Sequence, residues 1–414
     1  MGFFDRLRDS IPQRVRGDEL LFCLEEDPNS SLSQLEELFR IPPGGTSNRV
    51  VAREGEIELT FTAFGMAEVA ENGAYVQQCL QDAWNRFRQA PAPNADVQRN
   101  LLYHLRQCRG VVQVRYAFDG ANAQEREERT RDAYVLMGRA AGRLGGVVTQ
   151  GESALLDSQG RLILNTGGGS EVDFYLPPQQ AFNADCEGSA SPESRERKAR
   201  SMAWLRERYL YVTPSLPPLD DADRWHPRSA SEVCGRAAAL LAVSLYSECR
   251  LSEGMDYLRA KAFTQKVIDL FRADRFFSPG ERAYLDNPRS SQKEQIPFSW
   301  QYENLLVMEW ALGLADHLPY PSHVCDVPQA VRIMREHDSL EKLERACTLR
   351  SKEELLDAAD LIYRLDWACT DARVMGMPAP AGLDPGVVME RHRALFWLAG
   401  CGGPCDWDEV DLST

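Results

Sequence analysis

Apolar and polar residues alternate over residues 56–64, and this pattern predicts a β-strand with one buried face. A second apolar segment, residues 111–118, predicts another strand, and a third strand begins at Val147. Residues 155–164 read as two short strands around Ser-Gln-Gly, which predicts a hairpin. The first half of the chain is therefore expected to contain a small β-sheet.

Between these strands the apolar residues recur with the period of an α-helix. This pattern predicts helices over residues 73–89, 96–109 and 126–144. Residues 1–50 are expected to hold one helix, which a capping box of Ser31 and Gln34 would open. Helices interleaved with strands around a small sheet are typical of an α+β domain.

Beyond about residue 190 the pattern is helical. Capping boxes at Ser229, Ser278 and Ser351 each predict the start of a helix, and further helices are expected over residues 193–211, 300–314 and 385–398. The predicted fold class is α+β, in two domains. Residues 1–185 form a small-sheet α+β domain, and residues 186–414 form an all-helical domain.

Limited proteolysis tests this organisation. Residues 176–191 and the connector at residues 213–228 are polar and rich in small residues or proline, so we expect the first cuts there. Mass spectrometry of the early fragments locates the cuts. Early cleavage inside residues 56–164, with both connectors intact, would show that the boundary is misplaced.

The helix expected after Ser351 has an apolar face and a second, polar stripe. The stripe consists of Asp357, Asp360, Arg364, Trp367 and Asp371. One interpretation is a solvated face with an Asp360–Arg364 pair at i,i+4. The other is a groove in which arginines of neighbouring helices hold the carboxylates, with Trp367 as an apolar wall.

The groove interpretation takes further residues from this half of the chain, because carboxylates facing arginines form either structural networks or functional sites. The candidate residues are Arg228, Glu232, Arg236, Glu303, Trp310, Asp357, Asp360, Arg364, Trp367, Glu390 and Arg391.

Five segments in order and spacing resemble one bacterial family. They are residues 228–237, 310–314, 355–367, 387–391 and 407–410. Over roughly residues 195–414 the chain looks like the domain of unknown function 4272. The resemblance implies an all-helical domain of bacterial cytoplasmic proteins without an agreed activity, and it supplies no catalytic residue.

The formal net charge of −15 bears on possible partners. Affinity for duplex nucleic acid depends on Lys and Arg that neutralise phosphates, so nucleic acid is disfavoured. A basic protein partner would be attracted instead. No apolar stretch reaches the length that spans a bilayer and no export signal is visible, so we expect a cytoplasmic protein without a membrane partner.

The eleven cysteines are odd in number and widely spaced, which is typical of reduced thiols in a cytoplasmic protein. Cys401 and Cys405, with His392 nearby, supply too few ligands for zinc, so no metal is expected. The glycine-containing loop at residues 41–45 lacks the lysine of a P-loop, and no G-x-S-x-G or H-E-x-x-H motif occurs. No cofactor is therefore expected.

Two functions remain open. The first is a protein-interaction module, with toxin immunity or escort as one form, because the chain is acidic and carries no recognisable catalytic motif. The alternative is a hydrolase or nucleotide-processing enzyme that uses the carboxylates and arginines of the helical domain. A pocket lined by Asp357, Asp360, Trp367 and Glu390 would favour the enzyme.

Overall fold

The computed structural model describes residues 13–42, 49–66, 70–178, 190–219, 227–400 and 405–414. The chain divides into two compact units, Met1–Gln180 and Ala181–Thr414. The predicted boundary between residues 185 and 186 lies outside the described residues.

The first unit contains a sheet in which every described pair of neighbouring strands is antiparallel. The strand order is β2-β3-β4-β1-β5-β6-β7. The strands are β1 (Gln13–Cys23), β2 (Arg49–Glu54), β3 (Ile57–Gly65), β4 (Gly110–Gly120), β5 (Val147–Gln150), β6 (Ala154–Leu156) and β7 (Leu162–Asn165).

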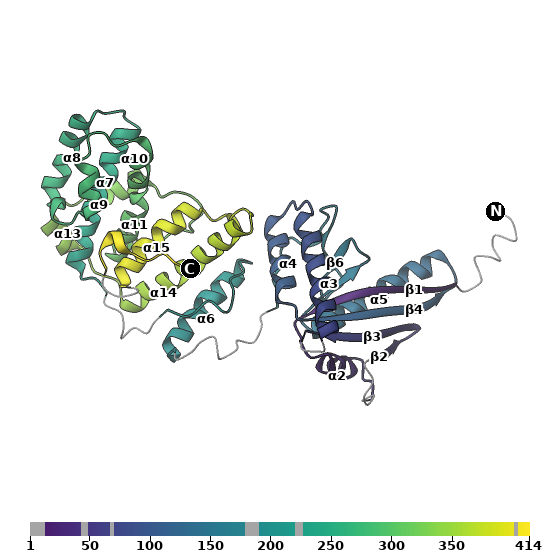
Figure 1. Cartoon of the computed structure of the whole chain (residues 1–414). Helices are drawn as coiled ribbons and strands as arrows, with labels where there is room; N and C mark the ends of the chain where they lie inside the picture. The colour runs from purple at the N-terminus through teal and green to yellow at the C-terminus, as the bar shows by residue number, and fades with distance from the viewer. Residues whose placement is uncertain (1–12, 43–48, 67–69, 179–189, 220–226, 401–404) are drawn as a thin grey trace. The chain divides into compact units, whose positions relative to one another are not determined.

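Among the described residues of this unit, four helices accompany the sheet: α2 (Pro28–Leu38), α3 (Ala70–Gln89), α4 (Ala95–Gln107) and α5 (Ala123–Arg143). Helix α5 packs on β1 and β4, α2 packs on β3, and α3 packs on β3 and β4 (Figure 1). The odd residues of β3 are buried, which confirms the predicted alternation. Leu59 and Phe61 belong to the hydrophobic core that the sheet shares with α5.

The helix predicted within residues 1–50 is present as α2, but strands β1 and β2 were not predicted. The predicted start of the helix was wrong, because α2 does not begin with a capping box at Ser31. It begins at Pro28, where the side chain of Asp27 accepts a hydrogen bond from the Asn29 amide. Proline is favoured in the first turn because it has no amide to leave unsatisfied.

The described residues of the second unit form helices and loops, with no strand among them. The α-helices are α6 (Pro192–Glu207), α7 (Ala230–Leu251), α8 (Tyr257–Phe271), α9 (Pro279–Leu285), α10 (Gln292–Ser299), α11 (Gln301–Ala311), α12 (Val327–Arg335), α13 (Leu340–Ala346), α14 (Lys352–Val374) and α15 (Pro385–Ala399). The capping boxes predicted at Ser229, Ser278 and Ser351 are confirmed. The fold class is therefore α+β, as predicted.

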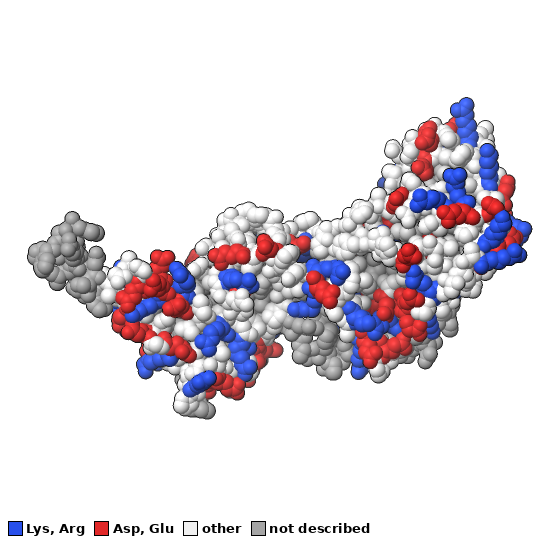
Figure 2. All heavy atoms as spheres, turned by 180° about the vertical axis from the view of Figure 1, so that it is seen from behind, with Lys and Arg blue, Asp and Glu red and all other residues white. Residues whose placement is uncertain are grey.

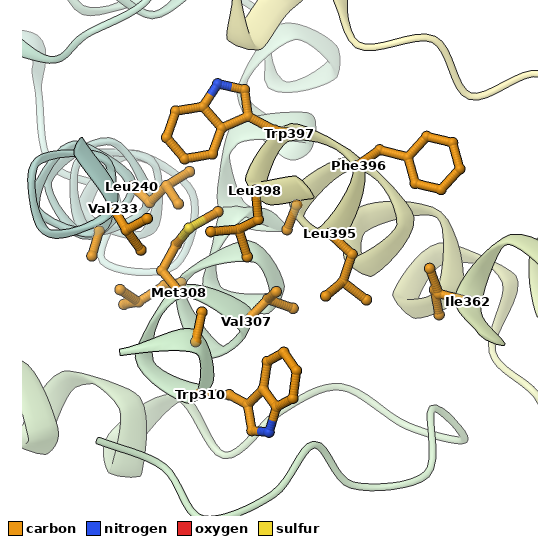
Figure 3. Close-up of a cluster of buried hydrophobic side chains, with 14 of the residues drawn as sticks. Val233, Leu240, Val307, Met308, Trp310, Ile362, Leu395, Phe396, Trp397 and Leu398 are labelled. Carbon is orange, nitrogen blue, oxygen red and sulfur yellow. The ribbon is translucent and has the colours of Figure 1, made fainter. Parts of the chain in front are cut away.

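Helix α7 is buried over most of its length and packs on α11. Its Gly235 allows a close approach, since a Cβ atom there would lie 2.3 Å from the Phe276 ring. Helices α14 and α15 complete the core. Figure 3 shows buried side chains of this core, among them Val233, Leu240, Val307, Met308, Trp310, Ile362, Leu395, Phe396, Trp397 and Leu398. Among the described residues, no helix has the length and apolarity that crossing a membrane requires.

Candidate functional site

Asp360 and Arg364 form an ion pair that is completely buried. Arg364 Nε lies 2.8 Å from Asp360 Oδ2, and Nη2 lies 2.7 Å from Oδ1. The guanidinium also donates to the backbone oxygens of Leu216 and Pro217. The solvated-face interpretation is therefore wrong for this pair, because the connector that precedes α7 covers it.

A second buried pair joins Glu303 of α11 to Arg391 of α15, with 3.2 Å between Oε2 and Nε. Glu303 also accepts from the Cys325 amide, and Arg391 donates to the Pro319 carbonyl. These contacts tie the segment after α11 to the core. Glu303 and Arg391 therefore cross-link α11, α15 and the segment after α11.

Glu390, the neighbour of Arg391, is also buried. It accepts hydrogen bonds from Asn304 Nδ2 and Arg393 Nη1, each at 2.8 Å. Burial raises the pKa of its carboxyl, and the charge of Arg393 opposes this shift. Like the two buried ion pairs, Glu390 has its partners within the fold.

Arg228, Glu232 and Arg236 lie together near the start of α7, in a recess of about 360 Å³. Arg228 stacks 4.7 Å from the Trp397 ring centroid and donates to the Cys405 carbonyl. Arg236 stacks 4.7 Å from the Trp407 ring centroid, and its guanidinium pairs with Glu281. These contacts hold residues 405–407 against α7 and α15.

One cavity of the second unit has a volume of about 810 Å³, and we call it the aromatic pocket. It takes in three of the predicted site residues, Trp310, Asp357 and Arg391. Its lining is Trp204, Arg208, Trp310, Asp316, His317, Leu318, Pro319, Tyr320, Pro321, Arg350, Glu354, Asp357, Ala358, Leu361, Ile362, Leu365, Arg391 and Leu395.

The walls of the aromatic pocket are mostly apolar. The rings of Trp204 and Tyr320 stack with 6.0 Å between their centroids. Leu361 and Leu365 of α14 and Leu395 of α15 contribute aliphatic surface. Because these residues come from four separate segments, the pocket exists only in the folded unit.

Several charged groups of the aromatic pocket are already engaged by the protein itself. Arg350 donates to the carbonyls of Trp310 and Asp316, each at 2.8 Å, and pairs with Glu354. Asp357 accepts two hydrogen bonds from Arg200, at 2.6 and 3.1 Å. These contacts fix the rim, and they leave apolar contact as the main interaction available inside.

The remaining predicted residue, Trp367, does not line the aromatic pocket. Its ring makes an edge contact with Tyr211, with 6.5 Å between centroids. The structure thus brings some predicted residues together but distributes the others among separate environments. Trp204, Tyr320 and Arg350 line the aromatic pocket but were not among the residues predicted from the sequence. A signal for part of the pocket was present in His-Leu-Pro-Tyr-Pro at residues 317–321.

His392 and Asp366 form a buried contact, with 2.8 Å between Nδ1 and Oδ2. Nε2 of this histidine is buried and has no hydrogen-bond partner within the described ranges of the chain. Cys401, considered above as a zinc ligand beside His392, lies outside the described residues. Within the described part of the chain, no cluster of three or more His, Cys, Asp or Glu could hold a metal ion. The expected absence of metal stays a prediction.

Charge on the surface is mixed. Figure 2 shows Lys and Arg interspersed with Asp and Glu on the visible face, without separation into one region of each sign. The net charge of −15 reflects the composition of the whole sequence, which has 62 Asp and Glu residues and 47 Lys and Arg residues.

A family model described as "Domain of unknown function (DUF4272)" matches residues 197–410. No curated protein and no solved structure matches the chain. The matched residues include the buried pairs Asp360–Arg364 and Glu303–Arg391, the recess near the start of α7 and the aromatic pocket. The match covers more than half of the 414 residues and agrees with the resemblance seen in the sequence. The chain therefore belongs to the family defined by domain of unknown function 4272.

Proposed function

We propose that the second unit is a protein-binding module, and that the aromatic pocket receives an apolar or aromatic anchor from a basic protein partner. The observation that carries this proposal is the combination of apolar walls with a rim whose charges are held in place. Binding through such a pocket depends on shape and apolar burial.

The size of the aromatic pocket fits this role. Its volume of about 810 Å³ lies within the range of roughly 300–1,000 Å³ that is usual for binding pockets. Protein interfaces gain most of their affinity from a few anchors that fill such pockets. Trp204 and Tyr320 offer rigid surfaces for an anchor at little cost in side-chain entropy.

Charge supports a basic partner. An excess of carboxylates raises the local concentration of a positively charged protein and suppresses binding of acidic ones. The chain carries a net charge of −15. Immunity to a basic toxin, or its escort, is one concrete form of this function. We expect the encounter in the cytoplasm, where widely spaced cysteines remain reduced.

The alternative, a hydrolase or nucleotide-processing enzyme, requires carboxylates that reach a substrate. Asp360 and Glu390 are buried and hydrogen-bonded to the protein, and Asp357 is bound by Arg200. Only Asp357 of the four residues expected around a catalytic pocket lines the aromatic pocket. These contacts favour binding over catalysis as the proposal.

The test uses Leu361→Arg, which places a charge in the aromatic pocket at a half-buried position. The matched control is Leu258→Arg on α8, where the side chain is 74% exposed and outside the pocket. We expect wild type and control to capture the same basic protein from cells of the source organism. Loss of a central anchor costs about 2 kcal/mol or more, so Leu361→Arg should weaken binding of the purified partner about 30-fold.

Calorimetric titration of the purified partner measures this difference, and thermal unfolding shows whether each variant is folded. Equal affinity of wild type and a folded Leu361→Arg variant would remove the aromatic pocket from the proposal. A captured partner that is acidic would contradict the charge argument.

A further inference from the structure

Two cysteines that are distant in the sequence meet in the second unit. Cys234 lies in the first turns of α7, and Cys347 directly follows α13. Their sulfur atoms are 3.5 Å apart, although 113 positions separate them along the chain. Both are free thiols.

The surroundings give the two thiols different access to solvent. Cys234 is completely buried, whereas Cys347 is partly exposed. Near them, Ser231 of α7 donates to Glu344 of α13 at 2.5 Å. Helices α7 and α13 are therefore already joined beside the sulfur atoms, so the thiols are held near each other in the folded protein.

We propose that Cys234 and Cys347 are a redox modification site, at which hydrogen peroxide forms a reversible disulfide between α7 and α13. The proposal is independent of the aromatic pocket and its partner. A disulfide has sulfur atoms about 2.05 Å apart, so the two sulfurs must approach by about 1.5 Å. Such a shift is small for Cys347, which lies at the end of a seven-residue helix.

The chemistry proceeds in two steps. Peroxide oxidises the accessible Cys347 thiol to a sulfenic acid, and one water is released. The sulfur of Cys234 then attacks the sulfur of that sulfenic acid. A sulfur–sulfur bond forms, the S–O bond breaks, and the thiol proton leaves with the hydroxyl as a second water. Two thiols and one peroxide thus give one disulfide and two waters, and a dithiol reverses the product by exchange.

The difference in burial also sets the order of the steps. Burial raises the pKa of the Cys234 thiol, so Cys234 stays protonated and is a poor first target for peroxide. Once Cys347 is a sulfenic acid, its partner sulfur is already in contact. Proximity then favours the disulfide over further oxidation.

Peptide mass spectrometry of the full chain tests the proposal. After brief treatment with hydrogen peroxide and alkylation of the remaining thiols, we expect a cross-linked peptide containing Cys234 and Cys347. Dithiothreitol should restore both alkylated peptides. The cross-link should persist in Cys249→Ser, which changes another buried thiol of the same unit, and be lost in Cys347→Ser and Cys234→Ser.

Thermal unfolding gives a second readout. A cross-link that closes a loop of more than 100 residues restricts the unfolded chain, so the oxidised protein should melt about 5 °C or more above the reduced protein. Irreversible oxidation of Cys347 without the cross-link, or full alkylation of both thiols after peroxide, would overturn the proposal. Because these outcomes are measured on wild type, they do not depend on whether a serine variant folds.

Discussion

Replacing Arg364 with alanine is expected to lower the free energy of unfolding by about 3–5 kcal/mol, because the carboxylate of Asp360 would remain buried without its counter-charge. Both side chains are completely excluded from solvent, and two hydrogen bonds of 2.7 and 2.8 Å join them. Denaturant unfolding measured for wild type and variant gives the difference directly.

Two further variants show whether charge or packing causes this loss. Arg200→Ala removes an arginine from an exposed pair with Asp357 and should cost no more than about 1 kcal/mol. The double variant Arg364→Met with Asp360→Leu removes both charges and should recover much of the stability. If Arg364→Ala unfolds within about 1 kcal/mol of wild type, the pair is accessible to water in solution.

The local signals in the sequence identified most helices and part of the sheet. Capping boxes predicted the starts of α7, α9 and α14, because the hydrogen bonds that define them lie within one turn. The alternation of apolar and polar residues in β3 could also be recognised within a short segment, because one face of that strand lies on the core.

Strand β1 was missed because two of its inward positions are not apolar. Gly17 makes room for the Tyr116 ring, which would lie 2.4 Å from a Cβ atom there. Glu19 is buried and accepts hydrogen bonds from Tyr134, Thr149 and Gly151. All of these partners lie about 100 residues or more away in sequence, so no local pattern contains them.

The candidate site was predicted less well than the fold. The stripe on α14 was recognised, but the burial of Asp360 and Arg364 depends on the connector before α7. In that connector the carbonyls of Leu216 and Pro217 accept hydrogen bonds from Arg364. The aromatic pocket likewise combines α6, the segment after α11, α14 and α15. Residue types reveal a polar stripe, whereas only the tertiary packing determines what covers it.

The second large expected effect is a free energy of unfolding that depends on pH, and Glu309 is its cause. Its side chain is completely buried, and neither carboxyl oxygen has a hydrogen-bond partner among the residues that the structure describes. Burial raises the pKa of this carboxyl from 4.5 to about 9 in the folded protein. The folded state therefore keeps a proton that the unfolded chain releases above pH 4.5, and stability must fall as pH rises between these two values.

The glutamine variant isolates this contribution, since Glu309→Gln keeps the shape and cannot ionise. Each pH unit between the two pKa values is worth about 1.4 kcal/mol, so from pH 5 to pH 8 wild type should lose roughly 4 kcal/mol relative to the variant. Other groups titrate in both proteins and cancel. Denaturant unfolding of both proteins across this range measures the difference.

The same substitution at Glu281 should change the stability of the protein in the opposite direction. Glu281 is also buried, but its carboxylate is paired with Arg236. Glu281→Gln leaves a buried guanidinium without its counter-charge, and we expect it to destabilise the protein by about 3–5 kcal/mol at neutral pH.

Glu309→Gln should be more stable than wild type at pH 8, because it removes a carboxyl that must either hold its proton or ionise without a partner. A stability difference between Glu309→Gln and wild type that does not change with pH would show that water reaches this carboxyl in the folded state.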